Sequence, residues 1–332
     1  MYQSLFEQFK KFKILVIGDV MIDAYLMGSV SRISPEAPVP VLNVKKREYR
    51  LGGAANVALN LKTMGAEPIL CSVIGNDDKG RLFISKMQEH NLIDDGIITS
   101  ANRRTTLKYR LLGNRNQMLR VDEEDDYLLD NQENSAFMKR IMTLLENQKV
   151  DAIIFEDYDK GVLSKENIQT IIQIANNKGI IIAADPKKRN FNHYTDINLF
   201  KPNLKEFCDA LHLAHDNISL DEIEKNIGIY AESKNIDNLL VTLSERGICI
   251  FDRLRNTFFY QPANILEVSD VSGAGDTVIS IATLCMVAQL PAQTIAIIGN
   301  LAGSIVCQFS GIVPVTVQLL EKEMIKQDIN LQ

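Results

Sequence analysis

Tryptophan is absent from this 332-residue sequence, histidine occurs only four times, and the five cysteines are scattered without a Cys-x-x-Cys pair. His212 and His215 are three residues apart, but no cysteine or carboxylate completes a set of zinc ligands around them. The odd number and wide spacing of the cysteines indicate reduced, mostly buried thiols of a cytosolic protein. A zinc module, a disulfide-stabilised secreted domain and a cysteine-based catalyst are therefore disfavoured.

The sequence also lacks an excess of positive charge and a long apolar run. Its 36 basic and 42 acidic residues give a net charge of −6, and no polybasic segment suggests a nucleic acid or an anionic membrane as partner. The first residues are typical of a short amphipathic helix and not of a signal peptide. The most apolar region, 278–306, is interrupted by polar residues and Pro291 and is expected to form two buried helices. These features predict a cytoplasmic globular protein with a small-molecule partner.

One stretch places small residues and a carboxylate directly before an apolar helix: Asp270-Val-Ser-Gly-Ala-Gly-Asp276-Thr277. The turn Gly273-Ala274-Gly275 lets backbone N–H groups approach a bound anion, and the following helix adds its positive end. Asp276 then lies in the first helical turn, where its carboxylate could accept a proton from a hydroxyl that attacks a phosphoryl group. The alternative is a tight turn in which Asp276 only favours the helix N-terminus.

Two other phosphate-binding motifs are absent. The nearest approach to a P-loop, between Gly75 and Leu82, lacks both the lysine and the hydroxyl residue that follows it. The turn at 273–275 has Val278 where a dinucleotide fingerprint needs glycine or alanine, and it lies near the C-terminus instead of in the first βα turn. Any phosphate site at this turn is therefore of another kind.

Buried strands alternate with helices along most of the chain. Residues 13–19 are typical of a central parallel strand, and ligands bind at the carboxyl ends of such strands in open α/β sheets. Asp19 and Asp23 are therefore expected near a pocket, with the capping of a turn as the alternative. Gly52-Gly53-Ala-Ala-Asn56 begins a helix that a ligand can approach closely, so Asn56 is expected to face the ligand. The pattern predicts one doubly wound α/β domain.

Two stretches have a different composition. Between residues 31 and 50, Pro35, Pro38 and Pro40 exclude a helix, and apolar residues lie among charged ones. Between residues 104 and 121, apolar and charged residues alternate irregularly about a turn at Gly113-Asn114. Together these stretches predict a small β-sheet lid outside the main sheet, within a single domain that spans 1–332.

The motifs, taken in order, resemble those of the ribokinase-like carbohydrate kinases, the PfkB family, over almost the whole chain. Gly52 to Asn56 is similar to the N-terminal signature of the family and Asp270 to Asp276 to its C-terminal signature, with Asn203-Leu-Lys-Glu206 between them. The resemblance implies a ribokinase-like α/β fold, with a doubly wound, mostly parallel sheet and a small β lid. It also implies an ATP-dependent kinase.

Within the family, residues 32–41, 157–161, 185–187 and 270–276 most resemble the kinases of D-glycero-D-manno-heptose 7-phosphate. Those enzymes phosphorylate C1 on the route to ADP-heptose for bacterial lipopolysaccharide. The kinase is often fused to a nucleotidyltransferase domain, and because this chain ends soon after its kinase signature, it is expected to resemble the stand-alone form.

The resemblance implies roles for individual residues. Asp276 matches the catalytic base, and the amides of Gly273, Ala274 and Gly275 match an anion hole that holds the transferring phosphoryl group. The positions that match sugar-binding residues are Asp19, Asp23, Gly52, Gly53 and Asn56. Those that match residues around ATP and its phosphates are Lys187, Asn203, Glu206, Thr242, Ser244, Gly247 and Asn300. Of these, Asn203 and Glu206 would organise Mg²⁺, directly or through water.

A substrate that already carries a phosphate needs cations at the other end of the pocket. Charge-assisted hydrogen bonds to phosphate are strong, and four basic residues lie on the expected lid or beside Asp157. They are Lys108, Arg110, Arg120 and Lys160, and Asp157 is itself expected to contact the substrate. The alternative is that the lid residues are solvated charges on a strand face.

Three departures from the family's pattern limit this transfer of roles. Asp159 stands where glycine is usual, beside Lys160. Ser310 and Pro314 stand where the family has the glycine and serine of a monovalent-cation loop, so K⁺ activation through a site that includes Asp270 is left open. Arg104 replaces a frequent proline.

The expected function is ATP-dependent phosphorylation of the C1 hydroxyl of heptose 7-phosphate, with Mg²⁺ and with no nucleic-acid or membrane partner. Two alternatives stay open: a kinase of the same family that acts on another sugar, sugar phosphate or nucleoside, and a sensor of sugar phosphates or nucleotides without catalysis. The exposed strand edges of the lid also allow a homodimer in which two lids pair.

Overall fold

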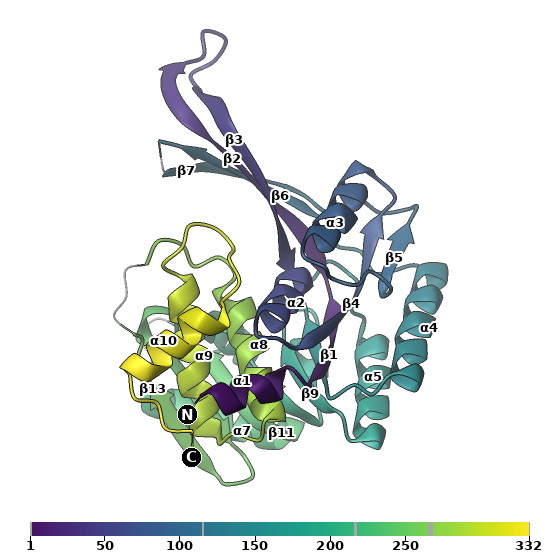
Figure 1. Cartoon of the computed structure of the whole chain (residues 1–332), viewed down its shortest axis with the longest axis vertical. Coiled ribbons are helices and arrows are strands. Elements are labelled where there is room, and N and C mark those ends of the chain that lie inside the picture. The colour runs from purple at the N-terminus through teal and green to yellow at the C-terminus, as the bar shows by residue number, and fades with distance from the viewer. Residues whose placement is uncertain (1, 115, 216–217, 265–267, 332) are drawn as a thin grey trace.

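A computed structural model describes residues 2–114, 116–215, 218–264 and 268–331, and it shows a layered α/β body with a separate β-sheet above it (Figure 1). Within these residues the body contains a nine-stranded sheet in the order β13-β12-β11-β10-β9-β8-β1-β4-β5. Its strands are β1 (Lys13–Gly18), β4 (Glu67–Gly75), β5 (Ile97–Ser100), β8 (Ala152–Glu156), β9 (Ile181–Asp185), β10 (Ile197–Phe200), β11 (Ile236–Thr242), β12 (Ile248–Asp252) and β13 (Thr257–Gln261). The pairs from β5 to β11 are parallel, and β12 and β13 extend the sheet antiparallel.

Helices cover both faces of the sheet, and two apolar cores result. One face packs against α1 (Gln3–Phe9), α2 (Ala54–Thr63), α3 (Asp78–Glu89), α8 (Ala274–Val287), α9 (Ala292–Val306) and α10 (Val317–Lys326). The other packs against α4 (Asn131–Asn147), α5 (Lys165–Lys178), α6 (Leu204–Leu211) and α7 (Leu220–Lys234). Successive residues of β1 alternate between the two cores, because strand side chains point to opposite faces. This alternation explains why the central strands are apolar throughout.

The apolar region 278–306 forms two helices, α8 and α9, as the sequence predicted. They are separated at 288–291, where Pro291 precedes the first residue of α9. Among the described residues, no helix has both the length and the apolar character that crossing a membrane requires.

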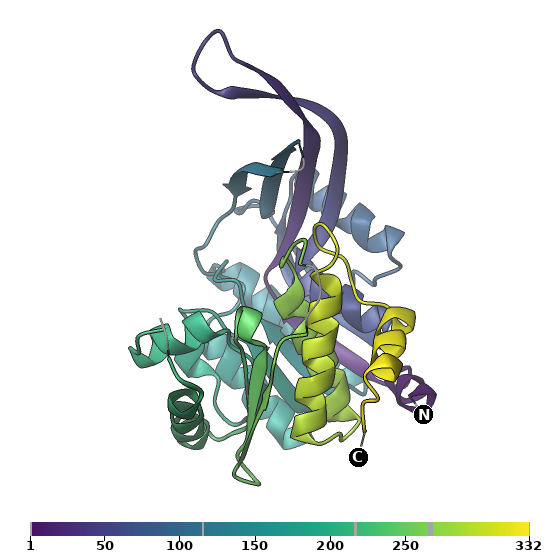
Figure 2. The ribbon, with the colours of Figure 1, turned by 90° about the vertical axis from the view of Figure 1, so that its left-hand side faces the viewer.

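The second sheet has the order β3-β2-β6-β7 and forms the lid. Its strands are β2 (Val20–Ile33), β3 (Pro40–Gly53), β6 (Leu107–Gly113) and β7 (Asn116–Glu123). The β2–β3 hairpin projects far beyond the body (Figure 2). Its base lies directly after β1 and directly before α2, so the lid is connected at both ends to the region where ligands are expected.

The predicted fold class, a doubly wound and mostly parallel sheet with a β lid, is confirmed. The lid segments have other bounds than the sequence indicated. The first is a hairpin of two strands, 20–33 and 40–53, which extends beyond the expected 31–50 at both ends. The reason is that β2 starts with buried apolar residues from Val20 to Tyr25, which are typical of the core, before it leaves the body.

Candidate active site

The N-terminus of α8 lies where the lid meets the body. Its N-cap residue, Gly273, has a φ of 80°, which favours glycine, and a Cβ built there would lie 2.8 Å from Nδ2 of Asn56. The turn therefore brings the start of α8 close to the start of α2. The Ala274 N–H donates to the carbonyl of Val271 at 3.3 Å, so this member of the predicted anion hole is engaged within the turn. The role of the three amides in binding a phosphoryl group stays a prediction.

Asp276 is buried in the first turn of α8, with 3% of its surface exposed. One carboxylate oxygen, Oδ2, accepts a hydrogen bond from Nδ2 of Asn56 at 2.7 Å, and Oδ1 accepts one from the hydroxyl of Tyr158 at 2.9 Å. Burial raises the pKa of Asp276, and the Asp185 carboxylate adds to this, while the two hydrogen bonds and Lys201 act against it. A carboxylate held at a fixed place with a raised pKa is suited to accept a proton.

Three charged side chains lie beneath the start of α8, at the carboxyl ends of three neighbouring strands. Glu156 ends β8, Asp185 ends β9, and Lys201 follows β10. Their positions in the strand alternation place all three on the face that packs against α8. The Nζ atom of Lys201 lies 2.6 Å from Oδ2 of Asp185, and a Cβ built on Gly275 would lie 3.4 Å from this Nζ. A buried ion pair therefore forms the floor under the predicted anion hole.

Glu156 differs from its neighbours because neither of its carboxyl oxygens has a hydrogen-bond partner among the described residues, although the side chain is fully buried. Burial raises the pKa of Glu156 well above its usual value, and the charges of Asp185 and Asp276 raise it further. Burial and these two neighbouring charges therefore favour the uncharged form of the side chain. Sequence reasoning did not single out Glu156, Lys201 or Tyr158, although the first two end apolar strands at the ligand-binding edge.

A cavity with a volume of about 1410 Å³ extends from Asp276 along the body. Its wall includes the residues predicted to lie around ATP, namely Lys187, Asn203, Glu206, Thr242, Ser244, Gly247 and Asn300. It also includes the three residues of the Gly273–Gly275 turn. The structure thus brings together residues that are up to 113 positions apart in the sequence, from Lys187 to Asn300.

Polar contacts within this wall fix several of these side chains. Asn203 and Glu206 form a reciprocal capping box at the start of α6, in which each side chain accepts a hydrogen bond from the backbone N–H of the other. The Nζ of Lys187 lies 2.5 Å from Oε1 of Glu206 and 5.3 Å from the ring centre of Tyr158. Nδ2 of Asn300 donates to the carbonyl of Pro262 at 2.8 Å.

The oxygen atoms at the Asp276 end of the cavity fit a divalent cation such as Mg²⁺. Oδ1 of Asp185 is buried, lies on a residue that lines the cavity, and has no hydrogen-bond partner among the described residues. Within the described chain, no cluster of three acidic, histidine or cysteine side chains could enclose a metal ion. Mg²⁺ would therefore be held by few protein oxygens, with phosphates and water completing its six ligands. The predicted roles of Asn203 and Glu206 toward Mg²⁺ stay predictions.

Two carboxylates that the sequence assigned to the substrate have other partners. Both oxygens of Asp19 accept hydrogen bonds from backbone N–H groups, those of Tyr158, Lys160 and Val162, at 2.9–3.1 Å. Asp157 follows Glu156 and so points to the opposite face of the sheet. There it accepts hydrogen bonds from the side chains of Asn190 and Tyr194.

These contacts give both residues structural roles, and their binding to the substrate stays a prediction. Asp19 holds the loop that carries Tyr158, and Asp157 is buried on the face away from Asp276. Asp159, in the position where the family's pattern has glycine, has a φ of 56°. Because this left-handed region favours glycine and tolerates aspartate better than most residues, the family's preference at this position has a backbone cause.

Asp23 has the free acceptor that a sugar hydroxyl needs. Its Oδ1 lies 2.6 Å from Nη2 of Arg110, whereas its Oδ2 is buried without a partner among the described residues, as is Nε of Arg110. A Cβ built on Gly52 would lie 2.3 Å from Oδ2 of Asp23, so glycine leaves room for this buried carboxylate. Burial raises the pKa of Asp23 to about 6, against the influence of Arg110.

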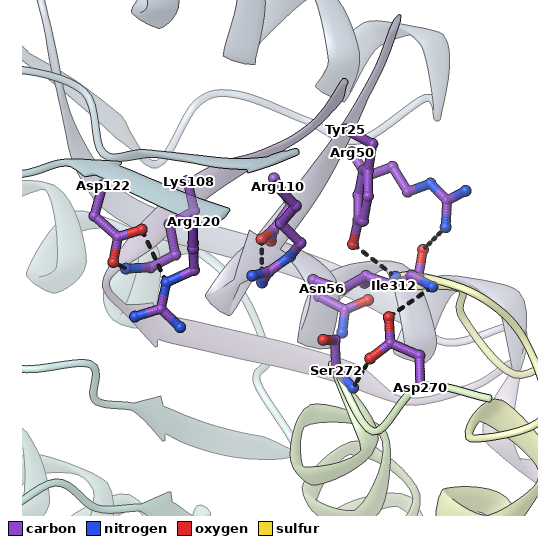
Figure 3. Close-up of polar contacts among 12 residues, drawn as sticks. Tyr25, Arg50, Asn56, Lys108, Arg110, Arg120, Asp122, Asp270, Ser272 and Ile312 are labelled. Atoms are coloured by element: carbon purple, nitrogen blue, oxygen red, sulfur yellow. Dashed lines mark hydrogen bonds and ion pairs between the residues drawn. The ribbon is translucent and has the colours of Figure 1, made fainter. Parts of the chain in front are cut away.

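The four predicted phosphate-binding cations are all paired with carboxylates, and Figure 3 shows Lys108 and Arg120 at Asp122. Lys108 contacts both Asp122 and Glu124, Arg120 contacts Asp122, and Lys160 contacts Glu124, at 2.7–3.0 Å. Three cations thus share two carboxylates, which leaves one positive charge in excess beside the Arg110–Asp23 pair. Their binding to a substrate phosphate stays a prediction.

We expect the variant Tyr158→Phe to shift the acidic limb of the pH profile of kcat/KM toward higher pH. The Tyr158 hydroxyl stabilises the ionised form of Asp276, so its loss raises the pKa of that carboxyl group, and the predicted base must be ionised to accept a proton. Rates between pH 5 and 9 measure the shift. Tyr127→Phe is the matched control, because that hydroxyl donates to the carbonyl of Asn102 at the surface. An unchanged acidic limb in Tyr158→Phe would contradict the positioning role of Tyr158.

Comparison with known proteins found a matching family model and relatives of similar sequence. Residues 11–316 match the model of the "pfkB family carbohydrate kinase". Two relatives named "Bifunctional protein HldE" are similar in sequence: that of Helicobacter pylori strain G27 is 40% identical over 296 residues, and that of Methylobacillus flagellatus is 39% identical over 315. These alignments cover 89% and 95% of this chain but 62% and 63% of the relatives, so the chain spans less than two thirds of their length.

Solved structures of two kinases share the fold. Phosphofructokinase-2 from Escherichia coli, crystallised in complex with potassium, superposes with a TM-score of 0.80 at 17% identity, covering 96% of this chain and 99% of the enzyme. Ribokinase from Arabidopsis thaliana, in complex with ribose and ATP, superposes with a TM-score of 0.70 at 15% identity, covering 94% and 97%. At these identities the likeness concerns the fold alone.

Proposed function

We propose that this chain, which belongs to the pfkB family of carbohydrate kinases, phosphorylates the C1 hydroxyl of D-glycero-D-manno-heptose 7-phosphate with ATP. That it is an ATP-dependent kinase follows from its family. The choice of substrate is supported by the relatives named HldE and by the sequence resemblance to heptose 7-phosphate kinases. The product would supply a later adenylyl transfer in the synthesis of ADP-heptose for lipopolysaccharide.

The observation that carries the proposal is the position of Asp276. Its carboxylate lies at one end of the large cavity, next to the nucleotide-side residues, and it is held from the lid side by Asn56. A hydroxyl of the acceptor bound under the lid would meet Asp276 on one side and the terminal phosphate of ATP on the other. Asp276 accepts the hydroxyl proton, and the start of α8 with Lys201 beneath it stabilises negative charge on the moving phosphoryl group.

The acceptor side offers groups for both ends of a sugar phosphate. The unpartnered Oδ2 of Asp23 accepts a hydrogen bond from a sugar hydroxyl, which removes the cost of a buried acceptor without a donor. The cluster of Lys108, Arg120 and Lys160 has a surplus of one positive charge and suits a phosphate at the far end. Mg²⁺, when bound near Asp185, would neutralise charge on the ATP phosphates.

A homodimer through the lid is part of the proposal as well. The lid strands and the β2–β3 connection expose Ile33, Val39, Met118, Leu119 and Val121, whose exposed fractions are 42–60%. A second copy of the chain that covered these side chains would also cover the edges of the lid sheet.

The test is ADP release by the purified chain with Mg-ATP and a panel of heptose 7-phosphate, fructose phosphates, ribose and nucleosides. We expect kcat/KM for heptose 7-phosphate to exceed that of ribose and the nucleosides by at least about a hundredfold, because acceptors without a phosphate do not neutralise the one positive charge in excess in the cationic cluster. Preferred turnover of a fructose phosphate would reject heptose 7-phosphate as the substrate but would leave the proposed active site unchanged. Release of ADP at the same rate without any acceptor would reject sugar phosphorylation.

A further inference from the structure

The loop 310–312 is attached to the turn that begins α8. Asp270, which lies shortly before Gly273, accepts two backbone hydrogen bonds: Oδ1 from the N–H of Ser272 and Oδ2 from the N–H of Gly311, both at 2.9 Å (Figure 3). Burial alone would raise the pKa of Asp270, but these hydrogen bonds and Arg110 lower it, so the carboxylate is charged. Asp270 thus fastens the loop to the segment that carries the predicted anion hole.

A lid residue holds the same loop from the other side. Nη1 of Arg50, near the end of β3, donates to the carbonyls of Ser310 and Ile312, each at 3.0 Å. Its Nη2 donates to Glu48 at 2.7 Å, and its guanidinium carbon lies 4.9 Å from the ring centre of Tyr25. The hydroxyl of Tyr25 accepts a hydrogen bond from the N–H of Ile312 at 3.1 Å. Figure 3 shows Arg50 and Tyr25 reaching down from the lid to Ile312, with Asp270 and Ser272 below.

Carbonyl oxygens beside a carboxylate can be held by a metal cation or by a guanidinium, and this structure contains the guanidinium. The phosphofructokinase-2 structure with potassium makes an external monovalent cation the natural comparison. The residues here do not fit such an ion well: the carbonyls of Ser310 and Ile312 accept from Arg50, and both Asp270 oxygens accept from amides. Pro314 contributes no side-chain oxygen.

We propose that Arg50 is a positioning residue for phosphoryl transfer, which holds the loop 310–312 and the turn before α8 in place of an external K⁺ ion. Because Arg50 belongs to the lid, the amides of the anion hole are correctly positioned only when the lid lies against the body. Acceptor binding under the lid therefore favours the catalytic arrangement at α8. The inference rests on the proposed function for its rate measurements but not for its melting-temperature measurements.

The first measurement compares the wild-type chain in KCl, NaCl and tetramethylammonium chloride at equal ionic strength. We expect kcat to agree within about twofold among the three salts, and the melting temperature to show no rise specific to K⁺, since a fixed guanidinium needs no exchangeable ion. Activation of the wild type by K⁺ of about tenfold or more over tetramethylammonium would overturn the proposal. So would a K⁺-specific rise in its melting temperature.

The second measurement uses Arg50→Ala, with Arg47→Ala, an exposed residue of the same strand, as the matched control. We expect Arg50→Ala to lower kcat by about a hundredfold with little change in KM for ATP. The reason is that the Arg50 guanidinium positions the predicted anion hole and not the residues predicted to bind ATP. K⁺ or millimolar guanidinium should restore part of this kcat, and K⁺ should raise the melting temperature. Arg47→Ala should match the wild type. Equal kcat in the two variants, or no rescue, would reject the positioning role.

Arg50→Lys guards against a variant that fails to fold. It keeps the charge but loses the planar fork that bridges two carbonyls, so we expect a kcat between those of the wild type and Arg50→Ala. Wild-type kcat in Arg50→Lys without K⁺ would show that the fork is not needed. If the wild type turns over no acceptor, the proposed function fails, whereas the melting temperatures of wild type and variants with and without K⁺ still decide the role of Arg50.

Discussion

Asp276→Asn is expected to lower kcat for ADP release by about a thousandfold, because the amide cannot accept the hydroxyl proton as the carboxylate does. ATP should still bind with nearly unchanged affinity, since the rest of the cavity wall is retained. Steady-state rates with the best acceptor of the panel and calorimetric titration with ATP measure the two effects. Near-normal turnover would reject Asp276 as the base and with it the proposed chemistry.

The matched control for this variant is Asp78→Asn. Asp78 is also an acidic residue in the first turn of a helix, α3, but its side chain is 92% exposed. If the only role of Asp276 were to favour the positive end of α8, the two substitutions would have similarly small effects. We expect Asp78→Asn to leave kcat unchanged, so the contrast separates proton transfer from the helix-dipole alternative.

Lys201→Met is expected to lower the free energy of unfolding by about 3–5 kcal/mol, because removing one partner of a buried ion pair leaves the other charge uncompensated. Lys201 and Asp185 are 3% and 5% exposed, so water cannot replace the lost contact. Urea unfolding followed by circular dichroism measures the loss. The double variant Asp185→Asn with Lys201→Met should recover part of it, since the stranded carboxylate is then removed. A decrease in the free energy of unfolding below about 1 kcal/mol in Lys201→Met would show that water reaches the ion pair.

Arg81→Met provides the comparison for an exposed pair. Arg81 contacts Asp78 one turn away on α3, and its side chain is 68% exposed. Exposed pairs contribute little, so the expected loss is below about 1 kcal/mol. Lys201→Met should also lower kcat, because Lys201 lies beneath Gly275 in the turn that starts α8. The two variants together separate the contribution of charge from that of burial.

Much of the fold could be predicted because its signals are local. The apolar run that became β1, the break at Pro291 between α8 and α9, and the turn at Gly113 each depend on a few neighbouring residues. The lid boundary was harder to predict because β2 continues from the core into the lid without a break. The amino-acid composition indicates which part of a strand is buried, but it does not indicate at which residue the strand ends.

The site was predictable on its nucleotide side and less so on its acceptor side. Lys187 comes just after β9 and Thr242 ends β11, and all seven residues predicted around ATP line one cavity, while their binding to ATP stays a prediction. Asp157 was predicted to contact the substrate, as was Lys160 three residues later. The single-residue alternation of β8 instead directs Glu156 toward α8 and Asp157 toward Asn190 and Tyr194. Sequence proximity does not determine the face on which a side chain lies.

By itself, the sequence determined the alternation of strands and helices, the family, and the turn that carries Asp276 into the first turn of α8, because each depends on residues close together in the chain. Only the tertiary structure decided what surrounds that carboxylate. Asn56 and Tyr158 donate hydrogen bonds to it from separate parts of the chain, and the charge of Lys201 acts on it from a third. Arg50 reaches the loop 310–312 across 260 residues. Such contacts form when the sheet and the lid assemble, and no short stretch of the chain contains both partners.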